Sequence, residues 1–206
     1  AFTEPDYGWN AESIQLDAIT EDGSFVLSGT KIFVPDAHIA DQLIIVARTR
    51  RSEDASVGIS MFLVDPATPG VSIRLQHGWI GDKVCEVTLD NVRVSESSLL
   101  GPEGEVWSAI EHVLDRATAL TSAYMAGGAQ KVVDMAVDYS KNRIAFGVPI
   151  GTFQRVQDLV IDALGAADRS RWTTYEALSK LDQGMEGASV GISMAKAVTS
   201  EAFPLA

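Results

Sequence analysis

The stretch "RIAFGVPIGTFQ", residues 143–154, carries side chains that could hold a large anionic ligand. A guanidinium such as that of Arg143 binds a diphosphate through its planar fork of donors. The amide of Gln154 can hydrogen-bond to the carbonyl and N–H edge of a planar heterocycle, and Phe146 and Ile150 lie between the two. On spacing alone, an ordinary connection between two helices with polar ends is an equally good interpretation.

Two stretches nearer the start of the chain suggest contacts to the same kind of ligand. "TEPDYG", residues 3–8, begins with Thr3 and forms a loop whose free backbone N–H groups can bind an anionic or carbonyl-rich group. "GTKIFVPDA", residues 29–37, places Phe33 at the end of a strand beside Pro35, where an aromatic ring can stack on a planar ligand. Taken singly, the first is better read as a plain turn and Phe33 as a core residue.

A fourth stretch, "DRAT" at residues 115–118, puts two charges inside a largely apolar helix. Charges in such a place need partners, a ligand or water. Asp115 and Thr118 are three residues apart and therefore share a helix face. A solvated stripe or an internal ion pair is the simpler interpretation of Asp115 and Arg116.

Several common kinds of site are absent from the sequence. His38, His77 and His112 have no metal-ligand spacing, so each is expected to be structural or exposed, and no metal site is predicted. There is no G-x-S-x-G elbow, no G-x-x-x-x-G-K phosphate loop and no G-x-G-x-x-G. The single cysteine, Cys85, excludes an intramolecular disulfide and fits a reducing cytosol.

The composition is that of an ordinary globular protein with an acidic surface. The 206 residues are 46% hydrophobic and carry a net charge of −12, and no basic run is present, which argues against nucleic-acid binding. No apolar run has membrane-spanning length, and there is no signal peptide. The chain opens on "AFTEPDYGWN", which resembles the middle of a domain, so we expect a fragment of a longer protein.

The first hundred residues must form strands and turns, because apolar and polar side chains alternate between Gly- and Pro-rich turn signals. Ser28–Gly29 interrupts the second apolar run and predicts a bulge or a tight turn. Strands spaced this regularly, without helices between them, predict an antiparallel β-barrel or sandwich over residues 1–100. The predicted strands lie in "SIQLDAIT", "FVLSGTKIFV", "DQLIIVART", "VGISMFLVD", "VSIRLQ" and "CEVTLDNVRV".

Residues 101–206 show the helical period instead. Helices are predicted over 105–142 and 153–182, and a third is predicted from about 187–190 to the end of the chain. These helices would form an up-down helical bundle that is incomplete. The fold class is therefore α+β with two domains, a β domain followed by the truncated bundle.

Glycine and proline mark particular points of these helices. Gly127 and Gly128 lower helix propensity, so they are expected to permit close packing against another helix. Gly184 is the predicted stop of the second helix. Pro204 is predicted to disrupt the last turn of the third.

Five motifs in one order resemble the acyl-CoA dehydrogenase family. They are the T-E-P-x-x-G loop, the G-x-K-x-[WF] strand, "CEVTLDNVRVSESSLLG", "LDR", and R-x-x-F-G-x-x-[IL]-x-x-x-Q-x-x-Q. The resemblance covers nearly all of the chain and matches the family's middle β domain and most of its C-terminal four-helix bundle. It implies that the leading helical domain and the end of the bundle lie outside this sequence.

The resemblance implies a flavoenzyme of fatty-acid and lipid metabolism. Members bind FAD, assemble as tetramers (dimers of dimers) and dehydrogenate an acyl-CoA thioester between its α and β carbons. A glutamate removes the α proton while the flavin takes the β hydrogen as hydride, and the electrons usually pass to an electron-transfer flavoprotein. The implied location is the cytoplasm, or the mitochondrial matrix in a eukaryote.

The resemblance also implies which residues bind the cofactor. Thr3 and Gly8 match the loop near the flavin ring, and Phe33 matches the aromatic that packs against the isoalloxazine. The connector at 143–154 matches the segment that reaches the FAD of the neighbouring subunit, with an arginine at its diphosphate. The matching residues of that connector are Arg143, Phe146, Ile150 and Gln154.

The sequence departs from the family where the flavin edge and the substrate would lie. Trp9–Asn10 stands where members usually have Ser-Asp, so Trp9 is expected to narrow or fill the substrate site. Pro35 stands where members have a hydroxyl that reaches the flavin, and proline has neither a hydroxyl nor an N–H.

The resemblance assigns no catalytic residue to this chain. Asp115 matches a substrate-binding position, but Thr118 replaces the usual arginine three residues later. Ala117 stands where some members carry their catalytic glutamate, so the base is expected outside this sequence.

Three functions remain open on the sequence. The leading prediction is an FAD-dependent acyl-CoA dehydrogenase, homo- or hetero-oligomeric, of which this segment alone binds FAD weakly and turns over nothing. The alternative is a catalytically degenerate subunit that supports FAD binding in a hetero-oligomeric dehydrogenase. An acidic binding module without flavin is the third.

Overall fold

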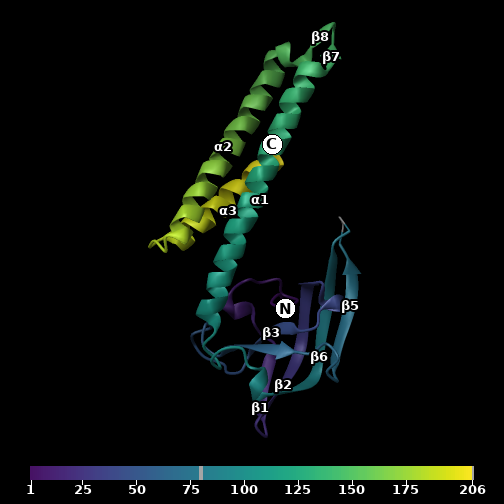
Figure 1. Cartoon of the computed structure of the whole chain (residues 1–206), viewed down its shortest axis with the longest axis vertical. Coiled ribbons are helices and arrows are strands. Elements are labelled where there is room, and N and C mark those ends of the chain that lie inside the picture. Colours follow the sequence, from purple (N-terminus) through teal and green to yellow (C-terminus); the bar gives the residue numbers. More distant parts are fainter. Residues whose placement is uncertain (79–80, 206) are drawn as a thin grey trace. The chain divides into compact units, whose positions relative to one another are not determined.

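A computed structural model describes residues 1–78 and 81–205 of the chain. The chain forms two compact units, Ala1–Ile110 and Glu111–Ala206, which are described separately. The first contains the strands of the main sheet and the second is helical (Figure 1). The predicted fold class, a β domain followed by helices, is confirmed.

Six strands of the described part of the first unit form a mixed sheet in the order β4-β3-β1-β2-β6-β5. Neighbouring strands are antiparallel except for β1 and β3, which pair in parallel at Asp17 and Arg48. The strands are β1 (Asp17–Glu21), β2 (Ser24–Pro35), β3 (Leu43–Arg48), β4 (Ile59–Val64), β5 (Val71–His77) and β6 (Lys83–Ser95).

Of the predicted alternatives, a barrel or a sandwich, the barrel is not formed by the described strands, because β4 and β5 are the two ends of the order. The outer edge of β4 is bonded to the segment 99–106 instead. The Leu100 amide donates to the Met61 carbonyl at 2.8 Å, and the Val106 amide donates to the Ile59 carbonyl at 3.3 Å. An edge whose backbone groups are already paired cannot also pair with β5.

Strand β2 is bulged twice against β6. The register shifts between Leu27 and Gly29, which confirms the predicted bulge at Ser28–Gly29. It shifts again between Lys31 and Val34, where Phe33 takes a left-handed backbone with φ of 52°. A bulge re-aims side chains locally, and here it leaves Phe33 exposed between the half-buried Ile32 and the buried Val34.

Apolar side chains from the strands form one core in the first unit, as the alternating pattern predicts. Phe25 and Phe62 meet edge to face at 5.0 Å between ring centroids. The core also includes Leu16, Leu27, Val34, Leu43, Ile45, Val64, Cys85, Val87, Leu89 and Val92. The single cysteine, Cys85, is free and buried in this core.

The second unit contains the helices close to their predicted bounds. They are α1 (Trp107–Asn142, which begins in the first unit), α2 (Gln154–Asp182) and α3 (Ala188–Leu205). Figure 1 shows α1 and α2 side by side, joined at one end by the hairpin of β7 (Ile144–Ala145) and β8 (Val148–Pro149). Small side chains line the contacts between the helices, namely Ala119, Ala129, Val133, Ala163, Ala167, Ala177, Ile192 and Ala195.

The predictions for Gly128 and Pro204 have different outcomes. A Cβ added to Gly128 would lie 2.5 Å from Cε2 of Phe203 on α3, which confirms that glycine permits close helix packing there. Pro204 lies inside α3, which continues to Leu205, so the predicted disruption is wrong. Proline lacks the backbone N–H that would donate to the preceding turn. Only one residue of α3 follows Pro204, so little of the helix depends on this missing hydrogen bond. Among the described helices, none is long and apolar enough to cross a membrane.

Candidate functional site

The loop that starts at Thr3 is anchored to β2 by buried groups. Thr3 is buried, and its carbonyl accepts from the Ile32 amide at 2.9 Å. The side chain of Glu4 is also buried, and its carboxylate accepts from the backbone amides of Gln15 and Leu16 at 3.0–3.1 Å. The stretch is a turn, as the simpler interpretation had it, and its first two residues are fastened into the core.

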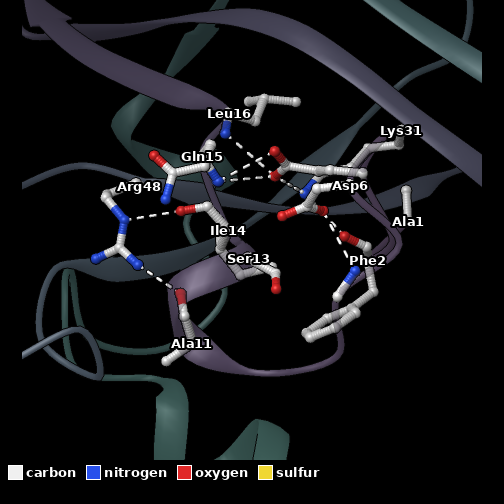
Figure 2. A network of polar contacts seen from close by, with 12 residues as sticks. Ala1, Phe2, Asp6, Ala11, Ser13, Ile14, Gln15, Leu16, Lys31 and Arg48 are labelled. Atoms are coloured by element: carbon white, nitrogen blue, oxygen red, sulfur yellow. Dashed lines mark hydrogen bonds and ion pairs between the residues drawn. The ribbon is translucent and has the colours of Figure 1, made fainter.

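A buried lysine supplies the counter-charge to this carboxylate (Figure 2). Lys31 is fully buried, and its Nζ donates to Glu4 Oε1 at 2.7 Å and to the Phe2 carbonyl at 3.0 Å. Burial lowers the pKa of Lys31, and the charges of Glu4 and Asp6 raise it back in part. These specific partners take the place of water around the buried amine and favour its charged form.

A second buried cation holds the far end of the same loop. Arg48 donates to the carbonyl of Ile14 at 2.8 Å and to that of Ala11 at 2.7 Å, as Figure 2 shows. It also donates to Ala55 and Val57. Burial lowers the pKa of Arg48, but its donors are satisfied by backbone carbonyls, as a buried guanidinium requires.

The tip of the loop requires glycine at one position. The Tyr7 amide donates to the Glu4 carbonyl at 2.9 Å, and Asp6 accepts from the Gly8 amide at 3.3 Å. A Cβ on Gly8 would collide with the side chain of Ser13. Gly8 is therefore fixed by packing within the loop, whatever ligand the loop binds.

Two exposed aromatic rings face each other where this loop meets β2. The rings of Tyr7 and Phe33 are 5.9 Å apart, and they are 64% and 51% exposed. Core packing of Phe33 is thereby excluded. Both residues have positive φ, 62° and 52°, a backbone that costs a side-chain-bearing residue about 1–2 kcal/mol. Backbone strain that places two rings in solvent is typical of a binding surface.

The other predicted residues of the first unit lie on the same loop and strand. Trp9 is 63% exposed and packs on Phe2 at 5.7 Å, and Phe2 in turn lies 6.4 Å from Trp107. Pro35 is the exposed last residue of β2. The structure thus brings Thr3, the Gly8 loop and Phe33 together.

In the second unit, the connector at 143–154 is a tight hairpin followed by a short 3-10 turn, η4 (Ile150–Thr152). The Ile150 amide donates to the Arg143 carbonyl at 2.9 Å. Phe146 and Gly147 form the two-residue tip, with φ of 53° and 82°, as a type I′ turn requires. Phe146 is 96% exposed and touches Phe153 edge to face. A ring so exposed has no packing role within the unit.

The polar groups of the connector are available to a ligand. Arg143 is exposed directly after α1. Gln154 is exposed, and its amide donates to Asp158 at 2.8 Å within α2. Gln157 donates instead to the Gly151 carbonyl at 2.8 Å, so it holds η4 in place.

The predicted substrate residues Asp115 and Thr118 are half-buried near the start of the second unit. Asp115 accepts from the Ser189 hydroxyl at 3.3 Å, while Arg116 is exposed beside a hollow that Asp182 also lines. Asp115 lies near one end of α1 and Arg143 just past the other.

Four residues that shape the first-unit site were not predicted from the sequence: Glu4, Tyr7, Lys31 and Arg48. A signal was present for Lys31, which stands at an inward position of a strand. A lysine there needs a buried partner, but nothing local identifies Glu4 as that partner.

The histidines have no common site. His38 Nδ1 lies 3.7 Å from Cys85 Sγ, and His77 and His112 are exposed. In the described ranges, no group of three or more His, Cys, Asp or Glu side chains could hold a metal ion.

Comparison with known proteins matches both units to one family. Residues 1–92 match the model of the acyl-CoA dehydrogenase middle domain, and residues 105–204 match that of the acyl-CoA dehydrogenase C-terminal domain. An acyl-CoA dehydrogenase of Bacillus subtilis is 33% identical over 98% of this chain and 54% of its own length. L-prolyl-(peptidyl-carrier protein) dehydrogenase of a Serratia species is 32% identical over 98% of this chain and 52% of its own length.

Solved structures agree with these matches. The structure of PigA with FAD and proline superposes with a TM-score of 0.90 at 30% identity, covering 100% of this chain and 54% of that one. Butyryl-CoA dehydrogenase from Megasphaera elsdenii superposes with a TM-score of 0.86 at 29% identity, covering 98% and 53%. The chain spans about half the length of the curated relatives it matches.

Proposed function

The chain belongs to the acyl-CoA dehydrogenase family, and from that premise we propose that the protein uses FAD to dehydrogenate an acyl-CoA thioester between its α and β carbons. The observation that carries the proposal is the exposed Tyr7–Phe33 pair beside the anchored Thr3–Gly8 loop. An aromatic face in solvent and a loop with backbone N–H groups suit a flat, carbonyl-rich ring. Two homologous solved structures of PigA contain FAD.

The residues of the first unit fit an isoalloxazine. Phe33 offers its ring as a stacking surface that also excludes water from one side of the cofactor. Thr3 offers its amide and hydroxyl from an anchored loop, and Gly8 would exchange its amide bond to Asp6 for the cofactor. Pro35 contributes shape only, because it has neither N–H nor hydroxyl. When bound, FAD supplies the acceptor for the β hydrogen, which leaves as hydride while the α hydrogen leaves as a proton.

The residues of the second unit fit the diphosphate and neighbouring parts of an FAD that is held by another subunit. We assign the diphosphate to the exposed guanidinium of Arg143 and the apolar contact to Phe146 and Ile150. Gln154 would exchange its intrahelical bond to Asp158 for the cofactor. The oligomer, which we propose is a dimer of dimers, would then be a requirement for full FAD binding.

We assign Trp9, Asp115 and Thr118 to the substrate. Trp9 is held against Phe2, so a rigid indole would limit the space for the acyl group. No residue of the described chain is assigned as the base that takes the α proton. Electrons would pass from the reduced enzyme to an electron-transfer flavoprotein. The degenerate-subunit alternative is less well supported, because this chain has an exposed aromatic pair, Tyr7 and Phe33, that suits a flavin of its own.

The test uses the protein purified as its complete natural chain. We expect a flavin absorption spectrum that bleaches when an acyl-CoA is added without oxygen. Arg143→Gln should weaken FAD retention at least tenfold, because it removes the diphosphate partner. Arg155→Gln, which removes a nearby exposed cation on α2, should leave retention unchanged. A colourless wild-type protein, or a flavin that acyl-CoA leaves oxidised, would contradict the proposal.

A further inference from the structure

One carboxylate closes the loop that carries Thr3, Gly8 and Trp9. Glu4 Oε1 accepts from the amides of Gln15 and Leu16, both at 3.1 Å, and Oε2 accepts from Gln15 at 3.0 Å. Gln15, Leu16 and Lys31 thus converge on this one group, and Figure 2 labels all three donors. The side chain at the start of the loop thus binds the backbone at its end, so the loop cannot shift without breaking these bonds.

The same carboxylate is joined to β2 immediately before Phe33. Lys31 Nζ donates to Glu4 Oε1 at 2.7 Å and to the Phe2 carbonyl at 3.0 Å. Between these two contacts, the Thr3 carbonyl accepts from the Ile32 amide at 2.9 Å. Three consecutive residues of the loop segment are therefore bonded to Lys31 and Ile32.

Phe33 itself has no pairing with β6 that would fix its position. The pairing of β2 with β6 stops at Lys31 and resumes at Val34, so Phe33 lies in the register shift. Its left-handed backbone is not that of a strand. The contacts on either side of the shift, above all those of Lys31, must therefore hold the residue in position.

The buried charges suit a positional role better than a stabilising one. The cost of removing two charges from water commonly offsets their attraction, so a buried ion pair adds little stability compared with an apolar pair. Consistently, burial lowers the pKa of Lys31 although Glu4 and Asp6 oppose the shift. An ion pair nevertheless constrains direction, because each hydrogen bond requires its own geometry.

We propose that the Glu4–Lys31 pair positions the flavin-binding surface, by holding the Thr3–Trp9 loop in register with Phe33. Neither residue needs to touch the cofactor, so both are positioning residues. The inference rests on the proposed function for the identity of the ligand, and on the described contacts for the mechanical link.

The test compares two variants of the complete natural chain, Lys31→Met and the core variant Val64→Ala. Methionine keeps the length of the side chain and removes the charge, while Glu4 keeps its two backbone donors. Val64→Ala creates a small cavity in β4, the edge strand at the β3 side of the sheet. The two variants are compared at urea concentrations that give equal fractions folded. Glu4→Gln is the milder second variant if Lys31→Met fails to fold.

We expect Lys31→Met to raise the FAD dissociation constant at least tenfold and to alter the visible circular dichroism of the bound flavin. Val64→Ala should leave both within about twofold of wild type. Equal changes of the FAD dissociation constant in the two variants would overturn the proposal. They would mean that the Glu4–Lys31 pair affects FAD binding only through the overall stability of the protein.

Hydrogen exchange in the flavin-free protein separates this inference from the proposed function. We expect the amides of Leu16 and Ile32 to exchange at least tenfold faster in Lys31→Met than in Val64→Ala. If wild type binds no FAD but this difference is found, the proposed function fails and the mechanical link stands. If exchange at both amides is the same in the two variants, the link itself is refuted.

Discussion

At the scale of single residues, the first unit keeps unfavourable features in one small region. Tyr7 and Phe33 have left-handed backbones, and Lys31 and Glu4 carry buried charges. Each costs free energy in isolation. They are tolerated because the core beneath them is well packed, and their common effect is to present two rings at a defined place.

Phe33 allows the backbone strain to be measured apart from the ring. Phe33→Ala and Phe33→Gly both remove the ring, but only glycine adopts φ of 52° without a steric cost. We expect Phe33→Gly to be about 1 kcal/mol more stable than Phe33→Ala in urea unfolding. Both should lose FAD affinity equally. Equal stability of the two variants would show that the left-handed backbone is not maintained.

Lys31 should make the unfolding free energy of the protein increase with pH. Its pKa is lowered below 10.5, mainly by burial, with Glu4 and Asp6 as the facing charges. Between the lowered pKa and 10.5, the unfolded chain therefore binds more protons than the folded chain, so the Lys31 contribution to the unfolding free energy rises with pH.

We therefore expect the unfolding free energy of wild type minus that of Lys31→Met to increase from neutral pH to 10.5. Urea titrations at several pH values measure it. Arg51→Met, which removes the cation of an exposed pair with Asp17, is the control and should give a flat difference. A difference for Lys31 that falls over this window would contradict the lowered pKa.

At the scale of elements, local irregularities place the candidate binding groups. The second bulge of β2 exposes Phe33, and the two-residue tip of the β7–β8 hairpin exposes Phe146. A regular strand would have buried or paired these positions. The long helix α1 shows the converse, since one of its two adjacent glycines, Gly128, permits close packing against Phe203.

Gly127 and Gly128 form a matched pair for testing that packing. A Cβ on Gly127 meets nothing within 4 Å, whereas one on Gly128 meets the ring of Phe203. We expect Gly127→Ala to stabilise the protein by about 1 kcal/mol through helix propensity. Gly128→Ala should gain less or lose stability, because the ring must move. Thermal and urea unfolding measure both, and identical gains would mean that α1 and α3 do not pack as described.

At the scale of the whole molecule, the helical unit exposes more large apolar side chains than a solitary soluble unit normally does. They include Val113, Leu120, Tyr124, Met135, Tyr139, Leu159, Ile161, Trp172, Tyr175, Val190 and Met194. Their spacing follows the helices, so they form stripes rather than isolated positions. Such surfaces need cover from further chain or from another subunit, as the proposed oligomer would provide.

We expect charged substitutions on these stripes to weaken association of the complete chain. Tyr124→Lys on α1 and Trp172→Lys on α2 should each lower the association constant at least tenfold in sedimentation velocity. Both side chains are largely exposed, so folding stability should change by no more than about 0.5 kcal/mol. Lys131→Ala, a polar exposed position of α1, is the control. If neither variant dissociates the protein, the stripes are not subunit contacts.

The amino-acid sequence was enough to predict the kinds of elements and the family. Period-two and helical patterns depend only on neighbours along the chain, so the strands and helices were found near their true bounds. The order of five motifs was enough for the family, and Ser28–Gly29 correctly marked a bulge. The assigned roles of Arg143 and the other site residues stay predictions.

Which distant segments of the chain contact each other could be learned only from the folded structure. The closure of the β4 edge by residues 99–106, the buried pairing of Lys31 with Glu4 and the outward turn of Phe33 all depend on such meetings. Local periodicity carries no information about them, because burial and edge pairing are set by contacts between residues far apart in the chain. For the same reason, the stretch 29–37 considered alone predicted that Phe33 is a core residue, whereas Phe33 is half exposed in the structure.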